Sequence, residues 1–269
     1  SGRGQAIQKI VDAYNQSNSD QTDIQLISGD EDMAAIQTLL ETDSETIFVL
    51  PYRYIQYFGS MGLLTDLTDD FIQESSLFYQ TVWELGMVKD SVYGIPWLGH
   101  SMCLLYNKNL LQKAGVSPES IVDLDSFVSA MDSIEQKTNA KGIGLVGADS
   151  NDVSWMVNQF VYGFGGRLVD STGQKVLIHR AESAAAIAFY KNGLGAHAQS
   201  SWINDTGTEV MEHFLNREVA FEIQGIWGLT DVQKNGSAFD VGVLPLKQIG
   251  ICSEIGPMML AIPQNMSDD

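Results

Sequence analysis

The first 65 residues alternate between helix-like and strand-like segments, and this alternation most constrains the fold. Apolar residues at helical spacing predict an amphipathic helix over residues 6–16 and a second one over residues 30–42, whose first turn is acidic. Short apolar runs at residues 22–27 and 45–51 are typical of strands. A third helix is predicted over residues 52–64, ended by glycines. Such alternation indicates an α/β layer fold with a largely parallel sheet.

The rest of the chain repeats this pattern without an internal repeat, a low-complexity tract or a long linker. Asp125 is the expected N-cap of a helix that carries Phe127, Met131 and Ile134. Residues 171–173 predict the turn of a short hairpin. Further helices are expected over 152–166, 181–195 and 207–216, and further strands over 141–147 and 219–223. The last two apolar runs are residues 239–246 and 256–264.

The charge balance excludes two classes of partner. The chain has 15 Lys and Arg against 34 Asp and Glu, for a formal net charge of −19. A field of that sign repels phosphate backbones and anionic lipid surfaces, so we expect no nucleic-acid partner and no adsorption to a membrane surface. The sequence also lacks the roughly 18 consecutive apolar residues of a membrane span.

The motifs of cofactor, metal and catalytic sites are absent from the sequence or wrongly placed in it. Gly142, Gly144 and Gly147 match G-x-G-x-x-G, but they lie within an apolar run instead of opening a helix. No P-loop, nucleophile-elbow or H-E-x-x-H motif occurs, and Cys103 and Cys252 are too few for a metal cluster. We therefore expect no cofactor, no metal and no catalytic residues, although the 34 acidic residues leave a glycosidase carboxylate pair open.

The four histidines are far apart in the sequence, and none is paired at i, i+4. We expect His179 and His197 to be surface residues and His213 to be structural. His100 differs because it lies in a loop beside an aromatic residue and just before an apolar run. It is therefore a candidate ligand contact.

Three tryptophans share a setting that suits a carbohydrate site. Trp97, Trp155 and Trp227 each lie beside turn residues and polar groups, not within an apolar run. An indole ring can cover the C–H face of a pyranose while neighbouring polar side chains hydrogen-bond to its hydroxyl groups. Tryptophans that close a core at the ends of helices and strands have the same setting, so both interpretations stay open.

Several motifs occur in an order that resembles one protein family. They are AIQKIVDAYNQSNSD, IFVLPYRYIQYFGSMGLLTDLTD, VYGIPWLGHSMCLLYNKNLLQKAG, FVYGFGGRLVD, FLNREVAFEIQGIWGL, VGVLPL and GPMMLAIPQN, and they cover almost the whole chain. The chain resembles the extracellular solute-binding proteins of bacterial ABC importers, in the carbohydrate-binding group that includes maltose-binding protein. Tyr-Gly-Ile-Pro followed by Tyr-Asn-Lys, and the later Gly-x-Trp, are its most specific elements.

The resemblance implies a type II periplasmic-binding-protein-like α/β fold, with two lobes joined by a hinge and a ligand cleft between them. Residues 1–107 with 253–269 would form the N-terminal lobe, and residues 108–252 would form the C-terminal lobe. CLLYNKN would be the first crossing between lobes, and the segment entering GPMMLAIP would be the return. A missing strand before the first helix and the early stop of the chain predict a sequence that is incomplete at both ends, without its signal segment.

Carried over by position, the family's ligand contacts fall on the ends of strands and on the loops that follow them. Trp155 and Trp227 match positions where the family commonly stacks sugar rings. The full set implied by the resemblance is Tyr52, Arg53, Trp97, His100, Asp149, Asn151, Trp155, Gly225 and Trp227.

The implied function is binding of a mono- or oligosaccharide for ABC import, with closure by hinge motion and without catalysis. The implied partners are the membrane permease subunits, and the protein would act as a monomer. It would work at the extracellular face of the bacterial membrane as a lipid-anchored lipoprotein, or in a periplasm. The alternatives are a binding protein of the same fold for a non-sugar solute such as a peptide or polyamine, a carbohydrate-active enzyme, or an adhesion or sensing protein.

Overall fold

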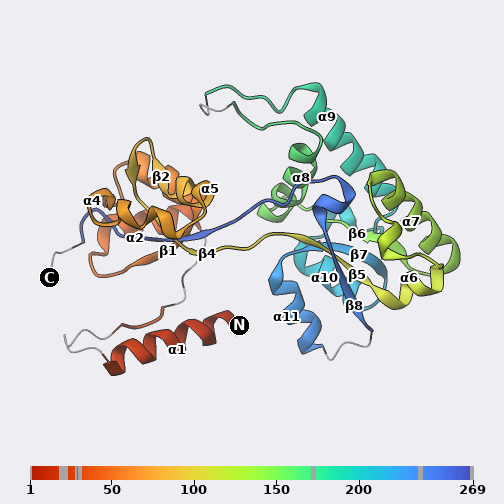
Figure 1. Ribbon diagram of the computed structural model, residues 1–269, viewed down its shortest axis with the longest axis horizontal. Helices are drawn as coiled ribbons and strands as arrows, with labels where there is room; N and C mark the ends of the chain where they lie inside the picture. The colour runs from red at the N-terminus through yellow and green to blue at the C-terminus, as the bar shows by residue number, and fades with distance from the viewer. Residues whose placement is uncertain are drawn as a thin grey trace. The chain divides into compact units, whose positions relative to one another are not determined.

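The computed structural model describes residues 2–17, 24–27, 29, 32–170, 174–235 and 239–266 (Figure 1). Its contacts divide the chain into unit 1, Ser1–Gly99 with Gly256–Asp269, and unit 2, His100–Ile255. The sequence placed these boundaries after residues 107 and 252. They differ because residues 100–107 and 253–255 make their contacts within unit 2, where Ser101 pairs antiparallel with Ile255.

Unit 1 contains a three-stranded antiparallel sheet in the order β1-β9-β4. The strands are β1 (Phe48–Pro51), β9 (Met258–Ala261) and β4 (Ile95–Leu98). The expectation of a largely parallel sheet is wrong for this unit. The physical reason is that the central strand is the returning end of the chain, which enters between two earlier strands and runs opposite to both.

Helices α2 (Met33–Thr42) and α3 (Tyr52–Ser60) pack against this sheet and enclose a small core. Ile55, Phe58, Leu64 and Met259 are fully buried there. Beside the sheet lies a short hairpin of β2 (Met87–Val88) and β3 (Ser91–Val92). The helices are α1 (Gly2–Ser17), α2 (Met33–Thr42), α3 (Tyr52–Ser60), α4 (Thr68–Phe71), η1 (Ile72–Leu77), α5 (Gln80–Trp83) and η2 (Glu84–Gly86).

The strand expected over residues 22–27 is not present in its described part. Residues 24–27 form no strand, and Ile24, Leu26 and Ile27 are exposed, while residues 22 and 23 lie outside the described residues. The apolar spacing there was therefore not a sign of burial. The neighbouring helix α2 was expected from residue 30 with an acidic first turn; it begins at Met33 with no acidic residue in that turn, and Asp32 caps it by accepting a hydrogen bond from the Ala35 backbone N–H.

Unit 2 contains a four-stranded mixed sheet in the order β6-β7-β5-β8. Only the β6–β7 pair runs parallel, and both pairings of β5 are antiparallel, so the parallel expectation fails for most of this sheet too. The strands are β6 (Lys141–Gly144), β7 (Val219–Gln224), β5 (Cys103–Asn107) and β8 (Val241–Pro245). The helices are α6 (Lys108–Ala114), η3 (Pro118–Ser120), α7 (Leu124–Lys137), α8 (Asn151–Gly163), α9 (Ala181–Ala188), η4 (Phe189–Leu194), η5 (Trp202–Asn204), α10 (Gly207–Leu215), α11 (Ile226–Lys234) and η6 (Leu246–Ile249).

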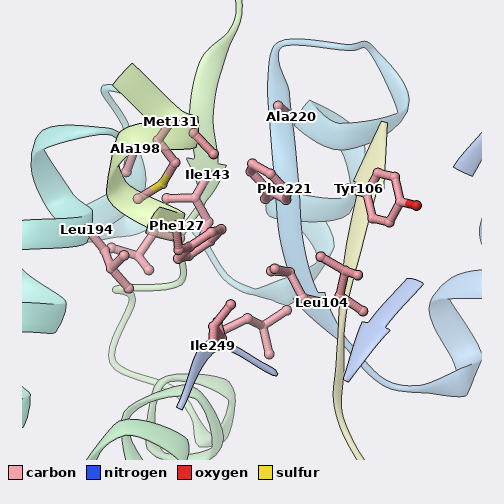
Figure 2. Close-up of a cluster of buried hydrophobic side chains, with 14 of the residues drawn as sticks. Leu104, Tyr106, Phe127, Met131, Ile143, Leu194, Ala198, Ala220, Phe221 and Ile249 are labelled. Atoms are coloured by element: carbon pink, nitrogen blue, oxygen red, sulfur yellow. The ribbon is translucent and has the colours of Figure 1, made fainter. Parts of the chain in front are cut away.

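Helices pack on both faces of the unit 2 sheet. On the larger face, Phe221 points from β7 toward Phe127 and Ile143, and the two phenylalanine rings meet edge to face at 5.0 Å (Figure 2). On the other face, Leu105 of β5 packs with Phe214 of α10 and with side chains of α11. A sheet covered on both faces has buried strands, and β7 is buried at all six positions, including the polar Glu222 and Gln224.

Three further details concern the expected helices, the hairpin and the membrane. Helix α7 is capped by Asp123, not Asp125, because its side chain reaches the Ser126 backbone N–H at 2.8 Å. The hairpin turn expected at residues 171–173 lies outside the described residues, although Val169 and Val176 on either side pair antiparallel. None of the helices described in the structure is long and apolar enough to cross a membrane.

Candidate functional site

The turn between β7 and α11 positions Trp227. The strand ends at buried Gln224, whose side-chain Oε1 accepts a hydrogen bond from the Gly225 backbone N–H at 3.0 Å. Gly225 then caps α11, and the half-buried Trp227 ring folds back over it. A Cβ atom on residue 225 would lie 2.2 Å from that ring, so only glycine allows this close approach. Gly225 was predicted to contact ligand, and its observed role is to make room for Trp227.

Trp155 lies in the second turn of α8, which follows the loop after β6. Hydrogen bonds to residues 199–207 hold this loop in place. Gln199 pairs with both backbone groups of Leu145 at 3.0 and 2.9 Å, and the Asp205 carbonyl accepts from Gly147 and Ala148, each at 3.1 Å. Trp155 itself is half-buried at the edge of the unit 2 core, which leaves part of its ring accessible.

His100 brings the two tryptophans together. Its ring stacks on Trp155 with centroids 5.8 Å apart and planes 25° apart. It also meets Trp227 edge to face, with centroids 4.8 Å apart. The three rings come from three separate segments of unit 2, and together they are called the aromatic cluster. The structure thus brings together three of the predicted site residues.

Polar side chains lie beside the aromatic cluster on α8. Gln159 donates to the Trp155 carbonyl at 2.9 Å and accepts from the Glu254 backbone N–H at 2.7 Å. Asn158 donates to the Glu254 carboxylate at 3.4 Å. The sequence prediction named neither Asn158 nor Glu254. The i, i+3 spacing from Trp155 could have indicated Asn158, whereas no local signal points to Glu254.

Two polar residues at the start of α8 and in the loop before it, Asp149 and Asn151, were predicted to contact the ligand. Asp149 is exposed, so its carboxylate is accessible from solvent. Asn151 begins α8, but its side chain lies outside the described residues. Their neighbour Asp152 accepts a hydrogen bond from the Gly207 backbone N–H at 2.9 Å, which ties the start of α8 to the start of α10.

A buried acid lies on β7, close to the turn that carries Trp227. Glu222 is 1% exposed, and its Oε1 accepts a hydrogen bond from the Gln224 side chain at 2.8 Å. Burial raises the pKa of Glu222 to about 8; the Gln224 hydrogen bond opposes this shift and the Asp231 carboxylate adds to it. Burial and Glu222 also raise the pKa of the Cys103 thiol, which donates to the Gln224 carbonyl at 3.3 Å.

Within unit 1, Trp97 lines a pocket of about 520 Å³. Its indole Nε1 is buried and finds no hydrogen-bond acceptor among the described residues. Tyr79 and Leu77 at the pocket are 86% and 73% exposed, so the pocket presents apolar surface to solvent. The lining residues are Ser76, Leu77, Phe78, Tyr79, Val82, Pro96, Trp97, Leu98, Gly99 and Pro257.

Tyr52 and Arg53 open α3 directly after β1. The Tyr52 backbone N–H donates to the carbonyl of Pro257, which also lines the Trp97 pocket, at 3.1 Å. The half-buried Tyr52 ring packs against the unit 1 core, and the Arg53 guanidinium lies 5.0 Å above the Tyr54 ring. The start of α3 therefore lies next to the wall of this pocket.

The remaining histidines take no part in the aromatic cluster. The expectation that His197 is a surface residue is wrong, because its side chain is only 12% exposed and lies between Asp132 and Glu135. His213 is structural, as expected, and links Asp205 at 3.3 Å to Glu218. In the described part of the chain, no group of three or more His, Cys, Asp or Glu side chains could hold a metal ion.

Comparison with known proteins identifies the family. The model of the bacterial extracellular solute-binding proteins matches residues 9–269. A solute-binding protein from Thermotoga lettingae, solved with α-D-tagatose, is 19% identical over 98% of this chain and 70% of that chain, with a TM-score of 0.81. The GacH receptor of Streptomyces glaucescens, solved with acarbose, is 21% identical over 97% of this chain and 68% of that chain, with a TM-score of 0.81.

A third similar structure has a ligand that is not a sugar. UgpB from Mycobacterium tuberculosis, in complex with glycerophosphocholine, is 19% identical over 98% of this chain and 68% of that chain, with a TM-score of 0.79. The fold of this chain is therefore that of the two-lobed solute-binding proteins. Since the family model matches nearly the whole sequence, the chain belongs to the bacterial extracellular solute-binding proteins.

Proposed function

We propose that this protein is the carbohydrate-binding component of an ABC importer. The observation that carries the proposal is the aromatic cluster, in which the His100 ring contacts both the Trp155 ring and the Trp227 ring. Partly accessible indole rings suit the C–H faces of pyranoses, and the adjacent Asn158 and Glu254 suit their hydroxyl groups. The ligand is a mono- or oligosaccharide, and it is bound without chemical change.

Unit 1 contributes a second contact surface under this proposal. The buried Trp97 N–H lacks an acceptor among the described residues, and a sugar hydroxyl or ring oxygen would supply one. The apolar lining around it would accept a C–H face. Tyr52 and Arg53 belong to the same surface through Pro257.

The ligand acts by favouring a closed arrangement of the two units. Closure by hinge motion is favoured only by contacts that the open arrangement lacks, so the sugar must touch both units. The closed form is the one that the permease subunits recognise. The family is extracellular. We propose that this member works as a monomer at the outer membrane face through a lipid anchor, or in a periplasm.

Titration calorimetry against a panel of mono- and oligosaccharides tests this function. We expect saturable heat without product for at least one sugar. Trp155→Ala and Trp227→Ala should each weaken binding about tenfold or more, about 1.4 kcal/mol, since each removes a stacking face. Tyr162→Ala, an aromatic truncation on the same helix α8, is the matched control and should bind normally. Product formation, or full affinity in both tryptophan variants, would refute the proposal.

A second candidate ligand is a quaternary ammonium compound. Aromatic rings near a carboxylate attract such cations. Gln159 links the Trp155 carbonyl to the Glu254 backbone N–H, and the Glu254 carboxylate accepts from Asn158 on the same helix as Trp155. A similarly folded protein was solved with glycerophosphocholine. Choline and glycerophosphocholine therefore belong in the same panel, and binding of either one without any sugar would favour this candidate.

A further inference from the structure

The hydrogen bonds of Glu222 lead directly to the aromatic cluster. Its Oε1 accepts from Gln224 Nε2 at 2.8 Å, and Gln224 Oε1 accepts from the Gly225 backbone N–H at 3.0 Å. The other carboxyl oxygen, Oε2, is buried and has no partner among the described residues. The Gln224 side chain thus connects a buried acid to the turn that starts α11.

The same turn sets the position of the Trp227 ring. A Cβ on Gly228 would lie 2.2 Å from Gln224 Cγ, so the Gln224 side chain lies directly against the first turn of α11. The Trp227 ring lies against Gly225 of the same turn. A displaced Gln224 would therefore shift Trp227 and its contact with His100.

The titratable groups around Glu222 are a thiol and a carboxyl group. They are Cys103 on the neighbouring strand β5 and Asp231 on α11. Strand β6 places Gly144 beside Glu222, and α10 contributes the apolar Met211 and Phe214 to this face. Two charged side chains of α10 interact with groups other than Glu222. His213 pairs with Glu218, and Glu209 accepts from Thr206. Lys234 of α11 pairs with Asp231 at 3.9 Å, and none of the ion pairs found among the described residues involves Glu222.

We propose that Glu222 is a positioning residue that holds Trp227 in its ligand-binding place only while its carboxyl group is protonated. The inference rests on the proposed function, because it assigns a pH-dependent control to the same site. An ionised carboxylate at this buried position needs water or a new donor, and the Gln224 side chain that binds Glu222 also holds the turn before α11, so rearrangement around the carboxylate is transmitted to that turn. The raised pKa of Glu222, about 8, places this change just above neutral pH.

Fluorine NMR of protein labelled with 5-fluorotryptophan tests the positioning role without any ligand. The chain has five tryptophans, and the Trp227 resonance is assigned by its loss in Trp227→Phe. We expect this resonance to titrate with a midpoint near pH 8 and to stop titrating in Glu222→Gln. Glu212→Gln, which removes an exposed carboxylate from α10, should leave the titration intact. A Trp227 resonance that does not respond to pH, or that still titrates in Glu222→Gln, would overturn the proposal.

Sugar binding provides the second readout. If only the protonated form is competent, the dissociation constant should rise about tenfold between about pH 7 and about pH 9, and it should stay constant in Glu222→Gln. Gln224→Met removes both hydrogen bonds and should shift the Trp227 resonance at every pH. If no ligand of the panel binds, the proposed function fails, while the fluorine titration still decides the role of Glu222. A pH-dependent dissociation constant that persists in Glu222→Gln contradicts that role.

Discussion

The contribution of Glu222 to folding stability should fall as the pH rises from acidic to neutral. Its carboxyl group ordinarily has a pKa of 4.5, and burial on β7 raises this pKa to about 8. Between these values the unfolded chain has lost the proton and the folded protein still keeps it. Each pH unit of increase in this window therefore lowers the Glu222 contribution to the free energy of unfolding by about 1.4 kcal/mol. Below about pH 4.5 this stabilising contribution is fully present.

The expected size of the effect follows from this window. A pH of about 7 is some 2.5 units above the ordinary pKa of a glutamate. The loss in the free energy of unfolding relative to acidic pH is therefore on the order of 3 kcal/mol. Such a loss is a large part of the stability of a typical domain. Glu222→Gln keeps the shape of the side chain and an acceptor for Gln224, but it cannot ionise. The variant should therefore become progressively more stable than the wild type as the pH increases.

Urea unfolding followed by tryptophan fluorescence measures this difference. Wild type and Glu222→Gln are compared at several pH values between about 5 and 8, so that other carboxylates cancel in the difference. Glu212→Gln serves as the exposed control and should run parallel to the wild type. A difference between wild type and Glu222→Gln that is the same at both ends of the pH range would refute the assignment of a neutral buried acid.

Three other substitutions test the packing of unit 2. Gly225→Ala places a Cβ atom 2.2 Å from the Trp227 ring, so it should displace the ring and weaken ligand binding with little change in circular dichroism. Phe221→Ala empties a fully buried position and should cost about 3–5 kcal/mol in chemical denaturation, whereas a cost under about 1 kcal/mol would contradict the packing shown. Tyr190→Phe removes the 2.6 Å hydrogen bond to the Val146 carbonyl and should cost about 1–2 kcal/mol, with an unchanged thermal midpoint as the contrary result.

Local sequence patterns predicted most of the helices and strands of the described chain. The buried strands β1 and β7 and the helices α2, α3 and α8 lie close to the segments where apolar spacing placed them. The direction of strand pairing could not be predicted in the same way. It depends on where distant segments enter a sheet, and the insertion of β9 between β1 and β4 leaves no local mark in the sequence.

The site could be predicted only in part for the same reason. The turn residues beside Trp155 and Trp227 indicated accessible rings, but the stacking of both rings on His100 joins three segments that are far apart in the chain. Glu222 gave no signal at all, because an acid within an apolar run does not reveal whether it is buried or paired. Its role depends on Gln224, which lies two residues further along the same face of the strand.

The central strand of unit 1 has a consequence for the order in which the chain can fold. Met259 of β9 is fully buried and pairs with Leu50, yet all of unit 2 is synthesised between them. Unit 2 is one uninterrupted segment, so it can reach its native structure while the end of the chain is still being made. In unit 1, the edges of β1 and β4 stay unpaired until β9 has been synthesised. Pairing β9 with these strands joins segments that are far apart in the chain, and such long-range contacts favour slow folding.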